Sequence, residues 1–319
     1  GLSTHHADSW LRAALPADGV YSIQLSDAQH KGGPEYAYRL RISRPRPDFE
    51  LRVVPSGVSV RPGGTVPLTL HALRKDGFAG EIDLVLKDAP AGFVLSGGRV
   101  PAKQECVRVT LTAPPRTLDE PVALFIEGRA MIQGREIVRP AVPAENMMQA
   151  FAYRHLVPAK ELLVAVSGRW VQKNTPRILS STPLRIPVGG TAMLRIAAPV
   201  RSFVGDVRIE LSEPPDGLSI RHVSAVRDGA EVVLQCDSAS AGPGLSGNLI
   251  FNAFAERGPA TGSANAPANR RRIPIGTLPA VPFEVVAATA KPPPYGAGLP
   301  SAPDDGNAPG RRKTDERTE

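Results

Sequence analysis

Histidine, cysteine, serine and acidic side chains are the groups with which this chain could do chemistry, and their spacing decides whether they could act together. The stretch Gly-Leu-Ser-Gly-Asn places Ser246 between glycines. A nucleophile elbow needs Gly-x-Ser-x-Gly on a strand-to-helix turn, whereas glycine follows this serine directly. The histidines do not have the His-x-x-Glu-His or Cys-x-x-Cys spacing that gathers zinc ligands, and no glycine-rich phosphate loop opens a helix. We therefore expect no catalytic, cofactor-binding or metal-binding set, and surface positions for His5, His6, His30, His71, His155 and His222.

Calcium is the one cofactor for which the sequence offers any ligands, because oxygen-rich loops between strands can bind it. Asp8, Asp18 and Asp27 lie in the N-terminal region, but no Asp-x-Asp or Asp-x-Asn run occurs there. A turn aspartate that bonds its own backbone is therefore the favoured interpretation. Paired carboxylates from distant loops stay an open alternative for glycoside or peptide hydrolysis, although the scattered acidic residues indicate solvated strand faces and turns.

Charge and cysteine content restrict the classes of partner. The net charge is +7 and the sequence pI is about 9.7, yet aromatic residues make up only 5%. Nucleic-acid recognition usually needs a reading element and interleaved aromatics, so we expect no nucleic-acid partner and solvated positions for the basic runs around Arg271 and Arg312. Cys106 and Cys236 lie one in each half, which predicts buried or half-buried thiols, with a bridge between the halves as the alternative. No apolar run approaches 18 residues, so no membrane span is expected.

Two halves of the chain repeat each other in sequence. RPGGTVPLTL from Arg61 is answered by PVGGTAMLRI from Pro187, and GFAGEIDLVL from Gly77 by SFVGDVRIEL from Ser202. A nearly constant offset across several blocks indicates a duplicated folding unit of domain size. The matched positions predict glycine turns and core residues: Gly63, Gly64, Phe78, Gly80 and Pro90 in the first copy, and Gly189, Gly190, Phe203, Gly205 and Pro215 in the second.

Short apolar runs separated by Pro-Gly, Asp-Gly or Gly-Gly predict an all-β fold built from tandem immunoglobulin-like β-sandwiches. Copy 1 covers residues 46–168, with strands expected near 49–54, 58–60, 65–73, 80–87, 92–95, 104–112, 121–130 and 160–167. A short helix is expected near 144–151, where Met147, Met148 and Phe151 follow Pro143. Copy 2 covers 177–288, with strands near 183–187, 191–198, 205–211, 217–223, 230–236, 246–254, 270–275 and 281–287. Residues 289–319 are rich in proline, glycine and charge, which predicts a disordered tail.

Residues 1–45 lie outside the repeat. Alternation over 20–27 and 36–42 predicts two strands with one apolar side each. The stretch DSWLRAALPADGVYSIQLSDAQHKGGPEYAYRLRIS, from Asp8 to Ser43, resembles the end of the bacterial pre-peptidase C-terminal (PPC) domain. The following PDFELRVVPSGVSVRPGGTVPLTL resembles immunoglobulin-like domains of large exported bacterial proteins. The resemblance implies that residues 1–45 are the trailing strands of a PPC-like sandwich, and the chain, which begins at Gly1 without a signal peptide, is expected to be a mature fragment.

These observations predict a non-catalytic accessory region of an exported bacterial protein, acting as a stalk, anchor, targeting segment or protein-interaction module. Upstream domains of the same chain and cell-envelope polysaccharide or protein are the expected partners, at a secreted, periplasmic or cell-surface location. One alternative is a carbohydrate-binding module that uses Trp10 and Trp170, although burial between domains is favoured for Trp170. Another is that the region belongs to a secreted peptidase or other hydrolase whose catalytic domain lies upstream.

Overall fold

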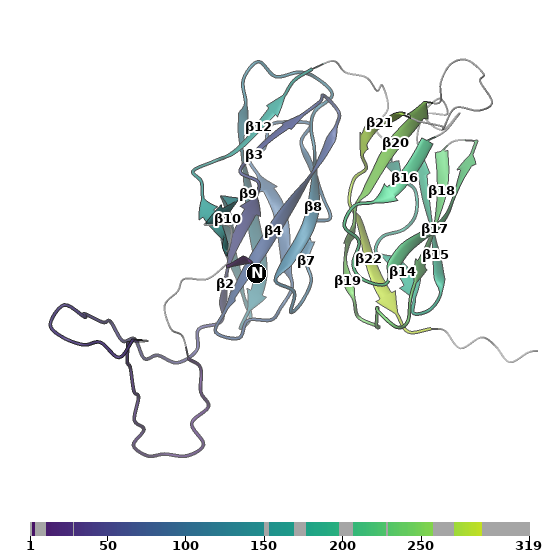
Figure 1. The fold of residues 1–319 in the computed structure, drawn as a ribbon. Helices are drawn as coiled ribbons and strands as arrows, with labels where there is room; N and C mark the ends of the chain where they lie inside the picture. The colour runs from purple at the N-terminus through teal and green to yellow at the C-terminus, as the bar shows by residue number, and fades with distance from the viewer. Residues whose placement is uncertain are drawn as a thin grey trace, which may run out of the picture. The chain divides into compact units, whose positions relative to one another are not determined.

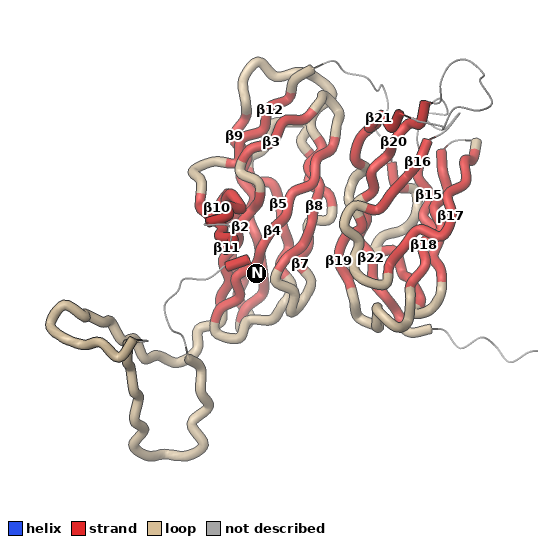
Figure 2. The backbone as a smooth tube through the Cα atoms, in the orientation of Figure 1, coloured by secondary structure: helices blue, strands red, loops and turns tan. Residues whose placement is uncertain are grey.

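The computed structural model describes residues 2–3, 11–27, 29–149, 153–168, 177–197, 207–227, 229–257 and 271–288. The chain divides into two compact units, of which Gly1–Ala288 holds all of the described residues. Strands are the only regular secondary structure within those ranges, as Figures 1 and 2 show. The all-β fold expected from the turn pattern is therefore confirmed.

The first sandwich has two layers that share one strand. One layer joins β2, β4, β8 and β6, and the other joins β3, β12, β9, β5 and β7. Strand β10 pairs with β9 through residues 135–140 and with β2 through 141–143, so it crosses from one layer to the other. The strands are β2 (Asp48–Val54), β3 (Gly57–Val60), β4 (Thr65–Lys75), β5 (Ile82–Lys87), β6 (Val94–Ser96), β7 (Arg99–Val100), β8 (Cys106–Thr112), β9 (Val122–Ile132), β10 (Arg135–Gln149), β11 (Tyr153–Pro158) and β12 (Leu162–Val166).

The core of the first sandwich follows from strand alternation. In β2, Phe49, Leu51 and Val53 are buried while the residues between them are partly exposed. Successive strand side chains point to opposite faces, so this pattern directs one face inward. Phe78 joins this core and stacks on Phe49 with ring centroids 5.6 Å apart. Apolar burial of this kind is the main force that holds the two layers together.

The second sandwich repeats the pairing pattern of the first. Its strand after the Gly-Gly turn, β15, pairs with β13 on one side and β18 on the other, as β4 pairs with β2 and β8. Its last strand, β22, pairs in parallel with β14, as β12 pairs with β3. The strands are β13 (Arg177–Ile178), β14 (Leu184–Pro187), β15 (Thr191–Ala197), β16 (Val207–Leu211), β17 (Leu218–Val226), β18 (Gly229–Cys236), β19 (Ser246–Leu249), β20 (Phe251–Arg257), β21 (Arg271–Thr277) and β22 (Val281–Val286).

The repeated turns also have the same backbone geometry in both copies. Gly63 has φ 66° and Gly189 has φ 67°, a left-handed conformation that glycine adopts without a steric cost. The next glycine of each turn donates its N–H to the carbonyl three residues earlier, at 2.8 Å in the first copy and 2.9 Å in the second. Asp88 and Glu213, which open the second repeated loop, have φ 48° and 47°. The duplicated sequence blocks thus encode matching turns.

Two expectations from the sequence fail. Residues 144–149 belong to β10 and pair antiparallel with β11, for example Met147 with His155, so the short helix expected near 144–151 is wrong there. Hairpin pairing between β10 and β11 overrides the helical signal. The strands expected over 20–27 and 36–42 are not found among the described residues of that segment, which form turns and loop (Figure 2). A strand needs a hydrogen-bonded neighbour. The expected tail at 289–319 lies outside the described residues.

Candidate functional site

The structure places only some of the residues singled out in the sequence. Trp10, Trp170, Phe203 and Gly205 lie outside the described residues, so neither tryptophan is located. Gly63, Gly64, Gly189 and Gly190 form the two equivalent turns, and Phe78 is in the core. Pro90 accepts a hydrogen bond from the backbone N–H of Phe93, and Pro215 accepts one from that of Leu218. These positions shape the fold and bring no reactive groups together.

His71 and Cys106 are the one Cys–His pair that adjacent strands bring together among the described residues, since they face each other across β4 and β8. A nucleophilic cysteine needs a lowered thiol pKa and a protonated imidazole beside it. Cys106 is exposed, so the buried or half-buried position expected for it is wrong, whereas Cys236 is buried as expected. Partial desolvation still raises the pKa of the Cys106 thiol, and the charge of Glu105 acts in the same direction. Burial lowers the pKa of His71. Both shifts favour the neutral forms, which is opposite to an activated thiolate–imidazolium pair.

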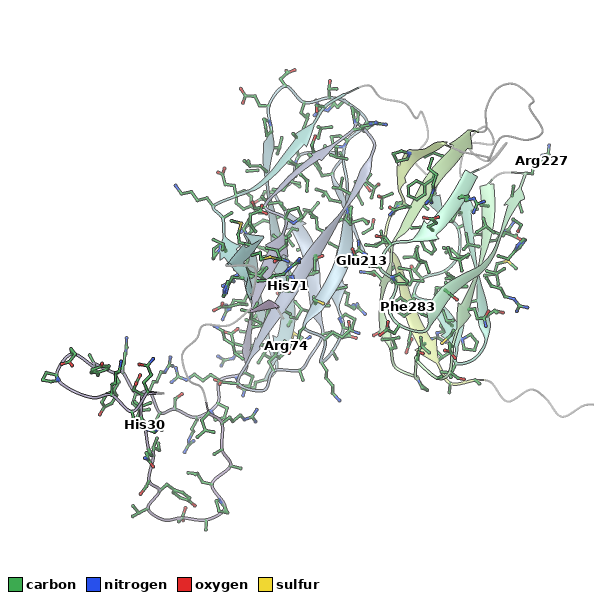
Figure 3. The ribbon with its side chains drawn as sticks, in the orientation of Figure 1. His30, His71, Arg74, Glu213, Arg227 and Phe283 are labelled. Carbon is green, nitrogen blue, oxygen red and sulfur yellow. The ribbon has the colours of Figure 1, made fainter. Side chains whose placement is uncertain are left out.

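Arg74 donates three hydrogen bonds to backbone carbonyls of the first sandwich. Its Nε donates to the carbonyl of Gln104 at 2.8 Å, Nη1 to that of Gly80 at 2.6 Å, and Nη2 to that of Pro101 at 2.9 Å. The guanidinium carbon lies 5.2 Å from the ring centroid of Phe78. A Cβ on Gly80 would meet the Phe78 ring at 2.9 Å, so glycine is needed beneath it. Arg74, labelled in Figure 3, therefore ties three loop segments to the core. Desolvation lowers its pKa, with Glu105 acting against that shift.

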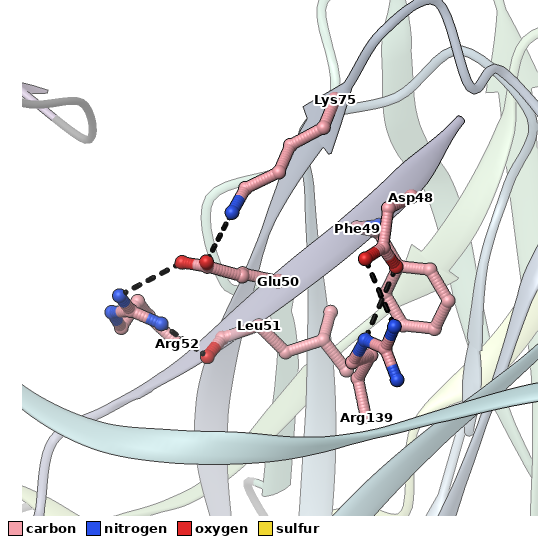
Figure 4. Close-up of polar contacts among 7 residues, drawn as sticks. All are labelled: Asp48, Phe49, Glu50, Leu51, Arg52, Lys75 and Arg139. Carbon is pink, nitrogen blue, oxygen red and sulfur yellow. Dashed lines mark hydrogen bonds and ion pairs between the residues drawn. The ribbon is translucent and has the colours of Figure 1, made fainter. Parts of the chain in front are cut away.

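A surface network surrounds the start of β2 (Figure 4). Arg139 donates to both carboxylate oxygens of Asp48, at 3.1 and 2.9 Å, and Glu50 pairs with Lys75 and Arg52. Desolvation raises the pKa of Asp48, but the hydrogen bonds from Arg139 and the backbone of Phe49 outweigh it and leave that pKa below its usual value. The hydrogen bond from Lys75 holds the pKa of Glu50 below its usual value. These ionised carboxylates connect neighbouring strands through ion pairs, and neither has the raised pKa of a general acid.

The remaining candidates also have structural surroundings. The carboxylate of Asp27 accepts bonds from the backbone N–H groups of Gln29 and Lys31 at 2.8 and 3.3 Å, which is the turn geometry favoured from the sequence. Ser246 begins strand β19. Within the described ranges, no three His, Cys, Asp or Glu residues are grouped so as to hold a metal ion. A surface depression of about 570 Å³ on the second sandwich includes Arg185 as the one ionisable residue of its lining.

The two sandwiches meet within the unit Gly1–Ala288 through a second set of polar residues, none of which the sequence motifs indicated. Gln104, Arg108 and Thr110 of the first sandwich bond to the second, and Asn248 of the second bonds to the first. One sequence signal was present, since Arg108 and Thr110 alternate with the buried Val107, Val109 and Leu111 and so lie on the outer face of β8. Which neighbour covers an outer face is not a local property, so the sequence alone could not assign the contact.

Comparisons with known proteins find likeness among solved structures. No family model matches the chain, and no curated protein matches it. Among solved structures, the chain is similar to domains 5–6 of the S-layer protein SbsC, with 14% sequence identity and a TM-score of 0.28, over 76% of this chain and all 100% of that one. Among the described residues, no helix is long and apolar enough to cross a membrane.

Proposed function

We propose that this region is a non-catalytic accessory part of an exported bacterial protein and that it works as a stalk with an attachment segment. The observation that carries the proposal is the use made of the charged side chains. Arg74 binds three backbone carbonyls, Arg139 binds Asp48, and Arg108 binds across the two sandwiches. These groups connect strands and loops and do not converge on the depression of the second sandwich, as substrate-binding groups would be expected to do.

The attachment role is assigned to residues 11–43. The side chains of Ile23 and Leu40 are 55% and 51% exposed, and Tyr38 and Ile42 are 76% and 74% exposed. Each of these side chains alternates with small or polar residues, as in strands that bury one face. Exposed contiguous apolar faces mark interaction sites. The segment thus fits pairing with β-structure of a neighbouring domain, and completion of a PPC-type sandwich by upstream residues of the same chain is our proposed arrangement.

The finer assignments extend this proposal. Secretion, a periplasmic or cell-surface location and adhesion to envelope polysaccharide or protein follow from the sequence resemblance to exported bacterial proteins. Several weak contacts on one chain would add up through effective concentration. Part of the association should weaken with salt, because exposed charges are screened within about 8 to 10 Å at physiological ionic strength.

Sedimentation with bacterial cell-wall material tests the attachment role. The double variant Ile23→Ser, Leu40→Ser removes one apolar side chain from the apolar face of each of the two alternating segments, 20–27 and 36–42. We expect it to reduce retention. The matched control, Ser22→Ala with Arg39→Gln, changes one residue on the polar face of each segment. It should leave the apolar contribution to retention intact. Equal retention of the chain and the apolar-face variant would refute the assignment to residues 11–43, and absence of retention on every material would leave only a spacer.

A further inference from the structure

The outer face of β8 is buried where the pattern of the strand would leave it in water. Val107, Val109 and Leu111 point into the core of the first sandwich, so Thr110 lies on the opposite face. Thr110 nevertheless has 0% exposure. Its hydroxyl accepts a hydrogen bond of 2.8 Å from the backbone N–H of Ala280, which belongs to the second sandwich. The second sandwich therefore covers Thr110 and also provides a hydrogen-bond partner for its hydroxyl group.

Arg108 and Gln104 extend this contact along the same sandwich. Arg108 donates through Nη1 to the carbonyl of Ser212 at 2.5 Å and through Nη2 to the hydroxyl of Ser212 at 3.1 Å. Glu213 lies 3.5 Å from the same guanidinium. Gln104 donates through Nε2 to the carbonyl of Ser246 at 2.6 Å. Two contacts from one planar guanidinium fix direction as well as distance.

Asn248 supplies the reciprocal contact. Its Nδ2 donates to the carbonyls of Gly97 and Arg108, at 2.7 and 2.8 Å. The fit is close, because a Cβ on Gly97 would meet Nδ2 of Asn248 at 2.4 Å. Gly97 also has φ 77°, a conformation that disfavours any other residue. The contact therefore needs the amide group of Asn248 as donor and the absence of a side chain at Gly97.

We propose that these contacts form a rotational lock that makes the two sandwiches move as one body. Tandem domains joined by small polar interfaces usually move relative to each other. This junction differs because Arg108 and Thr110 lie on β8 and Asn248 lies on β19, so rigid strands hold both sides. The two hydrophobic cores stay separate, one within residues 49–166 and the other within 184–285. The polar junction, and not a shared core, thus sets the relative orientation.

The lock deepens the proposed stalk role, because a spacer conveys position only when its joint is stiff. It rests on the contacts above and is independent of the attachment segment. Failure of the retention assay would leave the lock untouched, and a flexible joint would leave retention untouched. Failure of the attachment proposal can therefore be distinguished from failure of the lock.

Distance measurement between spin labels in the whole chain tests the lock. Met131 and Met193 are 65% and 52% exposed and lie on different sandwiches, so Met131→Cys and Met193→Cys carry the labels in a Cys106→Ser background. We expect a single narrow distance population. Adding Asn248→Ala together with Arg108→Met should replace it with a broad distribution.

A matched control and a second variant keep the test decisive. Lys87→Ala removes an ion pair with Glu127 on β5 and β9, in the layer that does not contain β8, and should preserve the narrow population. Gly97→Ala introduces the predicted clash with Asn248 and should shift or broaden the population, while circular dichroism shows that the strands persist. If the double variant unfolds, Gly97→Ala alone decides. A broad distribution in the parent chain, or a narrow one unchanged by both junction variants, would overturn the lock.

Discussion

Replacing Arg74 with methionine tests whether this side chain holds the first sandwich together or only lies on its surface. Methionine keeps an unbranched stem of similar bulk but removes the three bonds to the carbonyls of Gly80, Pro101 and Gln104. A hydrogen bond of this kind contributes about 1 kcal/mol net, and an exposed cation–π contact about 0.5 to 1 kcal/mol. Arg74→Met should therefore lower the free energy of unfolding by about 3 to 4 kcal/mol.

The assay is a urea titration read by hydrogen exchange of peptides from β4 and β8, so that the first sandwich is reported separately. Arg74→Lys keeps the charge but has no planar fork, so it should recover only part of the loss. Arg129→Met is the matched control, because among the described residues the exposed side chain of Arg129 makes only a long ion pair with Glu127, at 3.9 Å. Such a pair is worth about 0 to 1 kcal/mol. A cost for Arg74→Met no larger than that of the control would refute the role assigned to its three bonds.

Three further predictions follow from packing and burial. Gly128→Ala should destabilise the first sandwich by about 1 to 3 kcal/mol in urea unfolding, because its Cβ would meet Leu51 at 2.3 Å, whereas Gly57→Ala has nothing within 4 Å and should be nearly neutral. Phe78→Ala should cost the first sandwich about 3 to 5 kcal/mol and leave exchange in the separate second core almost unchanged; equal losses in both would contradict separate cores. Burial lowers the folded-state pKa of His71, so below about pH 6.5 the unfolded chain takes up a proton that the folded chain does not, and stability should fall with pH down to the folded pKa. Melting temperatures between pH 7.5 and 5.5 should show a smaller fall in His71→Gln, and an equal fall would contradict this origin.

Sequence predicted the strands well wherever the signal was local. The Gly-Gly turn and the alternation after it placed a strand at 65–73, and β4 runs from Thr65 to Lys75. Glycine at Gly63 and Gly189 is required by the positive φ of the turn, so the residue type itself reports the backbone. Turns and strand alternation depend on residues that are close together in the sequence, so the sequence alone can predict them.

Features that depend on which segment a strand contacts could not be predicted in the same way. Met147 and Met148 suggested a helix, but β10 is held by pairing with β11 and β2. The alternation of residues 20–27 and 36–42 indicates strands, yet no strand pairing forms among the described residues of that segment. The outer face of β8 looks solvent-exposed until the second sandwich is placed on Thr110. The contact that covers Thr110 comes from a residue 170 positions away in sequence, whereas the strand that pairs with Met147 and Met148 follows closely along the chain.

Turnover by the whole chain is the most direct measurement of the central claim that its side chains support structure and not catalysis. The purified chain, at high concentration, would be incubated with casein, bacterial cell-wall material and polysaccharides, and released peptides and sugars would be measured over time. We predict the same background release from the chain and from the variants His71→Gln, Cys106→Ser and Glu145→Gln. His71 and Cys106 are the cross-strand pair that is not activated, and Glu145 accepts hydrogen bonds from Ser56. Release that depends on the chain and is abolished by one of these single substitutions would contradict the account.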